Sequence, residues 1–229
     1  MRLSKMVVLG MLAAAFPHVA AAADRPVVVE LFTSQGCSSC PPANVYLNEL
    51  SKQRTDVLAL AFHVTYWDYL GWKDPFSLQT ATDRQARYGK RFGDGSYTPE
   101  IVVDGETGLV GSLREGVEAA IAKSRAKSAA ATDVWVAAKD GKVSIDVGRG
   151  RGAAKIYLVG YDREHVTVVG RGENRGRTMP ESNIVRSFRS VGDWQGAPVH
   201  IDQPFPDGEE VAVILESLDG RIVGAAKAR

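Results

Sequence analysis

The sequence is poor in the side chains that build metal sites, and it has no excess of one charge. Its 229 residues include two cysteines and four histidines, and 28 basic residues face 27 acidic ones. A histidine-rich metal site is therefore excluded. A net charge of +1 provides no bulk attraction for nucleic acid or for an anionic membrane. With 45% hydrophobic and 24% charged residues, the composition is that of a soluble globular protein.

The first 23 residues have the pattern of a signal peptide. Arg2 and Lys5 form a cationic start, the apolar run 6–16 is too short to span a bilayer comfortably, and the small residues at 21–23 suit cleavage. An uncleaved membrane anchor is the alternative interpretation. We therefore expect a periplasmic or secreted protein with no stable membrane span after cleavage.

A strand–helix–strand unit follows, and it contains both cysteines. Residues 26–32 form a β-branched apolar run, residues 38–54 carry apolar side chains at helical spacing, and residues 56–62 are again apolar. This order predicts two parallel buried strands joined by a right-handed crossover. Cys37 and Cys40 stand where the first strand gives way to the helix.

The pattern of the chain changes near residue 131. Before it we expect a helix over 77–92, strands over 101–103 and 107–110, and a third helix with a capping box at its start. After it, short alternating segments separated by turn signals predict six or seven strands. The expected domains are a signal peptide (1–23), an α/β domain (24–130) and a small antiparallel β-sandwich domain (131–229).

The spacing of Cys37 and Cys40 favours chemistry over a structural role. A bridge between residues three apart closes a very small loop and removes little entropy from the unfolded chain. At the start of a helix, amide donors and the helix dipole stabilise a thiolate and lower the pKa of Cys37. Cys40 would be shielded but within reach of the Cys37 sulfur. We therefore expect Cys37 to attack and Cys40 to resolve the mixed disulfide.

The Thr98-Pro99 pair, placed just before a predicted strand, completes a pattern that resembles the thioredoxin-like superfamily over about residues 26–128. The resemblance implies a thioredoxin-like central sheet with flanking helices over residues 24–130. It also implies a cis bond between Thr98 and Pro99, and a role for both residues in orienting an extended substrate. Further stretches, at 67–72 and 172–178, are similar to an exported branch of unknown function.

Two departures from the better-known thioredoxin-like proteins leave the redox direction open. Gly36 stands where thioredoxins usually have tryptophan, and the Ser38-Ser39 pair between the cysteines differs from theirs. Because the intervening pair tunes the reduction potential, the sequence fits an oxidant, a reductant or an isomerase.

Two polar residues in the predicted strands are further site candidates. Glu30, seven residues before Cys37, approximates the buried acid of thioredoxins and could relay a proton to or from Cys40. Equally, its carboxylate could find polar partners in the loop at 33–35. His63 could be a third metal ligand beside the two cysteines. A hydrogen-bonded histidine in an aromatic cluster is the favoured interpretation of His63.

Three other segments have two readings each. The aromatic connection at 66–76 favours packing between elements over lining a substrate groove. The arginine–glycine loops at 148–152 and 170–177 offer backbone and guanidinium donors to an anion. A brace in which these arginines pair with acids of the first domain is the favoured role.

The sequence therefore predicts an exported thiol-disulfide oxidoreductase that acts on protein or small thiols. It needs no cofactor beyond a redox-active disulfide between Cys37 and Cys40, and it needs an unidentified redox partner. One alternative is a periplasmic carrier of a metal or a thiol ligand that uses the same cysteines, with or without His63. Another is an interaction module in which the disulfide is permanently closed.

Overall fold

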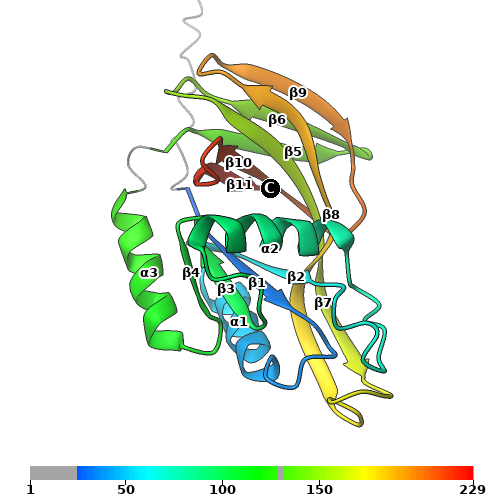
Figure 1. Cartoon of the computed structure of the whole chain (residues 1–229). Coiled ribbons are helices and arrows are strands. Elements are labelled where there is room, and N and C mark those ends of the chain that lie inside the picture. The colour runs from blue at the N-terminus through cyan, green and yellow to red at the C-terminus, as the bar shows by residue number, and fades with distance from the viewer. Residues whose placement is uncertain (1–24, 128–130, 229) are drawn as a thin grey trace, which may run out of the picture.

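The structure is a computed structural model that describes residues 25–127 and 131–228. Over these residues the chain is mostly β, with 43% strand and 20% helix (Figure 1). The three described helices all come from the first part of the chain, and the last part consists of strands and turns.

The first part of the chain supplies the elements that surround the cysteines. In chain order these are β1 (Val27–Thr33), α1 (Pro41–Gln53), β2 (Val57–His63), α2 (Gln79–Phe92), β3 (Glu100–Val103), β4 (Thr107–Val110) and α3 (Arg114–Lys127). Each of these elements was expected from the sequence. The predicted strand–helix–strand unit is therefore confirmed as a local arrangement.

The remaining strands differ greatly in length. They are β5 (Val134–Lys139), β6 (Lys142–Val147), β7 (Ala154–Val168), β8 (Thr178–Trp194), β9 (Val199–Pro204), β10 (Glu210–Ser217) and β11 (Ile222–Lys227). The longest two, β7 with 15 residues and β8 with 17, form one antiparallel hairpin. In Figure 1 this hairpin runs from the layer of β5, β6 and β9 down to the neighbourhood of α1.

One eight-stranded sheet runs through both parts of the chain, in the order β11-β10-β7-β8-β2-β1-β3-β4. Strands β1 and β2 are parallel, with Thr33 beside His63 at their carboxyl ends, which confirms the predicted parallel pair. Strand β8 joins β2 in parallel where Ile184 lies beside Ala61. This one pairing attaches the late strands to the sheet that carries the cysteines.

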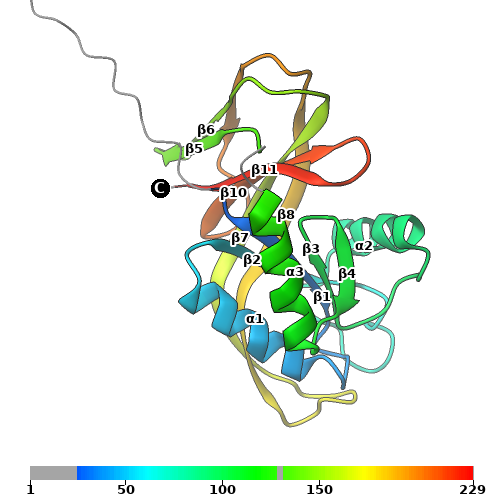
Figure 2. The ribbon, with the colours of Figure 1, turned by 90° about the vertical axis from the view of Figure 1, so that its left-hand side faces the viewer.

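Helices cover both faces of the first part of the sheet. Helices α1 and α3 pack on one face through residues such as Leu47 and Ile121, and α2 packs on the other through Ala81 and Tyr88 (Figure 2). The β5-β6-β9 sheet lies over the later strands and buries Trp194 between the layers. The core is thus divided among three apolar clusters.

The predicted fold class, a thioredoxin-like α/β sheet with flanking helices followed by a small antiparallel β-sandwich, is wrong. The late strands do not form a separate sandwich, because four of them extend the first sheet. The sequence suggests two short strands over 155–160 and 166–169 and none over 178–194. Polar residues at 162–165 interrupt the apolar alternation of β7, and Asn183 in β8 has a positive φ of 52°. Pairing along the whole hairpin overrides these weak local preferences.

A buried ion pair joins β1 to α2. Both carboxylate oxygens of Glu30 accept hydrogen bonds from Arg84, at 2.5 and 3.0 Å, and one of them also accepts from the Tyr88 hydroxyl at 2.6 Å. Arg84 also donates to Glu216 at 2.6 Å and is almost fully buried. Its guanidinium lies 4.5 Å from the centre of the Phe188 ring, which compensates part of its desolvation.

Among the described residues, no helix is long and apolar enough to cross a membrane. The predicted signal peptide, residues 1–23, lies outside the described residues, as does part of the predicted boundary between the domains, at 128–130.

Replacing Arg84 with methionine should strongly destabilise the fold, because it leaves the fully buried Glu30 without a cation. We expect the free energy of unfolding to fall by about 3–5 kcal/mol in urea denaturation. Arg163→Met is the matched control, since Arg163 pairs with Glu209 at the surface and should cost less than about 1 kcal/mol. Equal losses for the two variants would contradict the role assigned to Arg84.

Candidate functional site

The two cysteines form a disulfide between the carboxyl end of β1 and the start of α1. Cys37 and Cys40 are both fully buried, whereas Ser38 and Ser39 between them are exposed. Cys40 is the N-cap residue of α1, and the first helical positions are prolines, which lack an N–H group. The disulfide therefore lies just beneath the surface, with the two serines as its solvent-facing side.

The turn before the disulfide depends on close packing at Gly36. The Gly36 amide donates to the Ser34 hydroxyl at 3.0 Å, and the Cys37 amide donates to the Ser34 carbonyl at 3.1 Å. A β-carbon at Gly36 would lie 3.2 Å from the β-carbon of Trp67, so a larger residue would have to displace this tryptophan. Trp67 thus packs closely beside the turn at Gly36.

Ser39 connects the disulfide to Thr98. Its hydroxyl lies 3.4 Å from Cys37 Sγ and 3.4 Å from the Thr98 carbonyl oxygen. Trp67 donates from its indole nitrogen to the Thr98 hydroxyl at 2.8 Å. The Thr98–Pro99 bond is cis, as expected, and the Pro99 carbonyl accepts a hydrogen bond from Gly111 at 2.9 Å.

The loop over residues 170–177, at the tip of the β7–β8 hairpin, lies on the disulfide turn. The buried side-chain amide of Asn174 donates to the Gln35 carbonyl at 2.9 Å and to the Cys37 carbonyl at 2.8 Å. Glu173 accepts from the Ser38 amide at 3.3 Å. Gly172 has a φ of 72°, and a β-carbon there would lie 3.2 Å from that of Trp72. This loop therefore helps to bury the disulfide.

A buried polar cluster lies behind the turn and consists of Gln35, Asn44, His63, Asp74 and Glu181. The Asp74 carboxylate accepts a hydrogen bond from the Gln35 backbone amide at 2.7 Å. The same carboxylate is hydrogen-bonded to His63 Nδ1, also at 2.7 Å. Glu181, from β8, accepts from the Gln35 side chain at 2.7 Å and from Asn44 at 3.0 Å. The cluster thus joins β1, α1, β2 and β8 in one hydrogen-bonded unit.

The carboxylates of this cluster favour a charged histidine. Burial alone lowers the pKa of His63, but the charges of Asp74 and Glu181 more than offset it and raise that pKa to about 9. The pKa of Asp74 is lowered although burial opposes it, because the His63 charge lies beside it. Burial raises the pKa of Glu181. His63 is therefore protonated at neutral pH, and it neutralises charge that the fold has buried.

Comparisons with known proteins identify the family of this chain and a similar solved structure. A family profile described as a protein of unknown function, DUF1223, matches residues 28–216. The chain belongs to this family. A crystal structure of the protein AGR_C_4864 from Agrobacterium tumefaciens is 32% identical, with a TM-score of 0.78 over 91% of this chain and 96% of that one.

A second solved structure shares the fold alone. HBP35 of Porphyromonas gingivalis is 14% identical, with a TM-score of 0.57 over 89% of this chain and 74% of that one. No curated protein matches this chain.

Glu30, the candidate proton relay, lies on the sheet face covered by α2, away from α1. Both of its carboxylate oxygens are engaged by Arg84 and Tyr88, and none of its described hydrogen bonds joins it to Cys37 or Cys40. The alternative, polar partners in the loop at 33–35, is also not observed. The strand alternation explains this placement, since Glu30 and Leu31 must face opposite sides of the sheet.

His63, the weak metal candidate, has its Nδ1 atom on Asp74, while its Nε2 atom lies 3.7 Å from Glu181 without a hydrogen bond. Its ring also packs edge-on against Phe76 at 5.6 Å. No group of three or more His, Cys, Asp or Glu side chains in the described ranges is arranged to hold a metal ion.

The arginine–glycine loops do not form the expected brace. The loop at 170–177 does reach the first part of the chain, but its contacts come from Glu173 and Asn174. Within residues 25–127 and 131–228, no hydrogen bond or ion pair holds the side chains of its three arginines. The aromatic connection at 66–76 is largely packed, as expected, except that Tyr69 is 78% exposed.

The residues missed by sequence reasoning are those that approach the disulfide from far along the chain. Asn174 lies 137 residues from Cys37, and Glu181 lies 146 residues from Gln35. Nothing in the local pattern marks either residue. The available signals were an asparagine between glycines of a loop and a glutamate in a segment without strand periodicity.

Replacing Asn174 with alanine should expose the disulfide, because two buried carbonyls then lack their donor. A loss of about 1–3 kcal/mol raises the population of the opened loop, and we expect reduction by dithiothreitol to accelerate about tenfold. Stopped-flow or gel-shift measurement of free thiols provides the rate. Asn48→Ala removes a single exposed hydrogen bond from α1 to the Pro180 carbonyl and should leave the rate unchanged. An equal effect of the two variants would rule out a specific role for Asn174.

The stability of the protein should decline between about pH 6.5 and pH 9. A histidine whose folded-state pKa exceeds its unfolded value stabilises the fold below the unfolded pKa, and this stabilisation is lost as the pH rises through the folded pKa. For His63, with values of 6.5 and about 9, we expect a loss of about 3 kcal/mol in urea denaturation. His63→Gln should remove this decline and His200→Gln, at the surface, should retain it. A wild-type curve as flat as that of His63→Gln would refute the assignment.

Proposed function

We propose that this protein is an exported thiol-disulfide oxidoreductase whose redox centre is the Cys37–Cys40 disulfide. The observation that carries the proposal is the position of this disulfide, at the start of α1 and at the carboxyl ends of two parallel strands. Ligands of open α/β sheets bind at this edge, and helix starts favour negative charge. This position supports the proposal, because a helix start would favour a thiolate at Cys37.

The proposed reaction transfers two electrons in two exchange steps. In the reduced protein, the Cys37 thiolate attacks a substrate disulfide, a mixed disulfide forms, and one substrate thiolate leaves and takes up a proton. The Cys40 thiolate then attacks Cys37 Sγ, which closes the Cys37–Cys40 disulfide and releases the second substrate thiolate. The substrate is reduced and the protein is oxidised. The reverse sequence oxidises a substrate dithiol.

Ser39 is the group best placed to stabilise the Cys37 thiolate. The prolines at the start of α1 remove two amide donors that a helix N-terminus otherwise presents. The Ser39 hydroxyl, 3.4 Å from Cys37 Sγ, can instead donate a hydrogen bond to the sulfur when it carries a negative charge. The Thr98 carbonyl accepts a hydrogen bond from the same Ser39 hydroxyl. Thr98 and Pro99 would together orient a substrate chain beside the Cys37 sulfur.

A relationship to the thioredoxin-like superfamily is part of this proposal, and it rests on the dithiol segment and its contact with Thr98 rather than on the overall fold. Export, with a periplasmic or secreted location, also belongs to the proposal and rests on the sequence pattern of residues 1–23. The redox partner that restores the dithiol is a second thiol-disulfide protein or a small thiol.

The trapping of a mixed disulfide tests the proposal. Cys40→Ser should accumulate covalently on a reducible protein substrate through Cys37, whereas Cys37→Ser should not, and both variants should reduce insulin at the background rate. The wild type should reduce insulin or reactivate scrambled ribonuclease, and its thiols should titrate against glutathione buffers. Absence of turnover and trapping, with stoichiometric uptake of copper or zinc by the reduced protein, would replace this proposal with the carrier alternative.

A further inference from the structure

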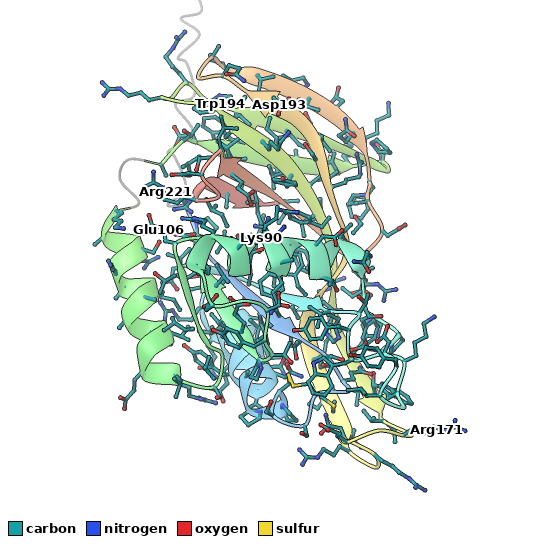
Figure 3. All side chains as sticks on the ribbon, viewed as in Figure 1. Lys90, Glu106, Arg171, Asp193, Trp194 and Arg221 are labelled. Carbon is teal, nitrogen blue, oxygen red and sulfur yellow. A yellow bond between two sulfur atoms is a disulfide. The ribbon has the colours of Figure 1, made fainter. Side chains whose placement is uncertain are left out.

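The 170–177 loop carries a cluster of cations that the fold itself does not use. Arg171, Arg175 and Arg177 are exposed, and the described part of the chain holds no hydrogen bond or ion pair to their side chains. Figure 3 shows Arg171 extending away from the ribbon at the tip of the hairpin. Some other surface arginines do pair with acids, as Arg114 does with Glu49. The loop therefore offers free guanidinium groups.

The loop that carries these cations contacts the disulfide turn. Asn174, between Arg171 and Arg175 in the loop, donates to the Cys37 carbonyl at 2.8 Å, and the neighbouring Glu173 lies 3.3 Å from the Ser38 amide. The loop thus forms a rim beside the exposed Ser38 and Ser39, which cover the disulfide.

Glu173 shows that this rim can bind a carboxylate. Its carboxylate, which is exposed, accepts a hydrogen bond from the Ser38 amide between the two cysteines. The same position can be taken by a carboxylate of an incoming chain, while the free guanidinium groups neutralise further acidic side chains. The loop's own acid therefore stands where an acidic ligand would be bound.

Apolar surface adjoins the cations. Tyr69 is 78% exposed and Leu70 is 48% exposed, and the next residue, Gly71, packs against Gly172 of the loop, with a β-carbon at Gly71 placed 3.7 Å from Gly172 Cα. Together, the three cations and the two apolar side chains form a surface that spans two segments of the chain. This surface is larger than a small thiol would cover. The surface suits several consecutive side chains of an extended polypeptide.

We propose that the 170–177 loop, together with Tyr69 and Leu70, is a docking surface for an acidic polypeptide segment that presents its cysteine to the Cys37–Cys40 disulfide. This inference rests on the proposed redox function and adds the substrate class to it. Carboxylates of the segment pair with Arg171, Arg175 and Arg177, and a flanking apolar side chain packs on Tyr69. Its cysteine then lies over Ser38 and Ser39.

The chain contains a matched control for this surface. The second arginine–glycine loop, at 148–152, carries Arg149 and Arg151, which are likewise exposed and without a described partner. It precedes β7, whereas the 170–177 loop follows it, so the 15-residue strand separates the two by roughly 45 Å. The double variants Arg171→Gln/Arg175→Gln and Arg149→Gln/Arg151→Gln remove the same charge from similar loops, and only the first is near the disulfide.

The experiment compares two synthetic peptides, each with one cysteine activated as a mixed disulfide with nitrothiobenzoate. One carries Asp and Glu around the cysteine, and the other has Asn and Gln in their place. With reduced full-length mature protein, we expect exchange with the acidic peptide to be about tenfold faster, and this preference to disappear in 0.5 M salt. Arg171→Gln/Arg175→Gln should abolish the preference, and Arg149→Gln/Arg151→Gln should retain it.

Binding of a cysteine-free acidic peptide, followed by fluorescence anisotropy, separates docking from redox chemistry. Binding that weakens about tenfold only in Arg171→Gln/Arg175→Gln supports the docking surface even if neither activated peptide exchanges, a result that would refute the redox function alone. Exchange with both peptides at equal rates and no binding would overturn the docking surface and leave the redox function intact. Equal losses in the two double variants would also overturn it, because a general charge effect would then explain them.

Discussion

The requirement to satisfy the polar groups of a fully buried turn organises this molecule. The turn before Cys37 carries backbone donors and acceptors that have lost contact with water, and each unpaired group would cost free energy. Its partners come from three distant places: Asp74 after β2, Glu181 in β8 and Asn174 in the loop beyond β7. The later part of the chain, by joining the first sheet, therefore supplies two of the three partners of this turn.

Two buried clusters of charged residues lie on opposite faces of the sheet. Alternation along β1 directs Glu30 toward α2, where Arg84 neutralises it, and directs Thr33 toward α1, where it donates to Asn44 at 2.8 Å. The first cluster fastens a helix to the sheet. The second, centred on His63, fastens the disulfide turn. Each cluster keeps its charges paired, which is what makes the burial of so many ionisable groups tolerable.

The sequence contains enough information for the local structure and too little for the assembly. Apolar periodicity predicts β1, α1 and β2 because their burial is determined by neighbouring residues. The expectation that Thr98 lies near Cys37 and Cys40 came instead from the resemblance to the thioredoxin-like superfamily. Periodicity does not predict β8, whose polar side chains and irregular Asn183 conceal its strand character until pairing with β7 and β2 is known. The expected fold class was wrong for that reason. Asn174 and Glu181 could not be assigned to the site before that pairing was known.

The position of Glu181 makes the surroundings of the disulfide depend on strand register. Because side chains alternate along a strand, a slip of one residue in β8 would turn Glu181 to the opposite face and withdraw it from Gln35 and His63. An insertion or deletion in β8 would therefore disrupt the hydrogen bond between Glu181 and Gln35, which lies 146 residues earlier in the chain. The surroundings of the two cysteines thus depend on the length of β8, although neither cysteine lies in that strand.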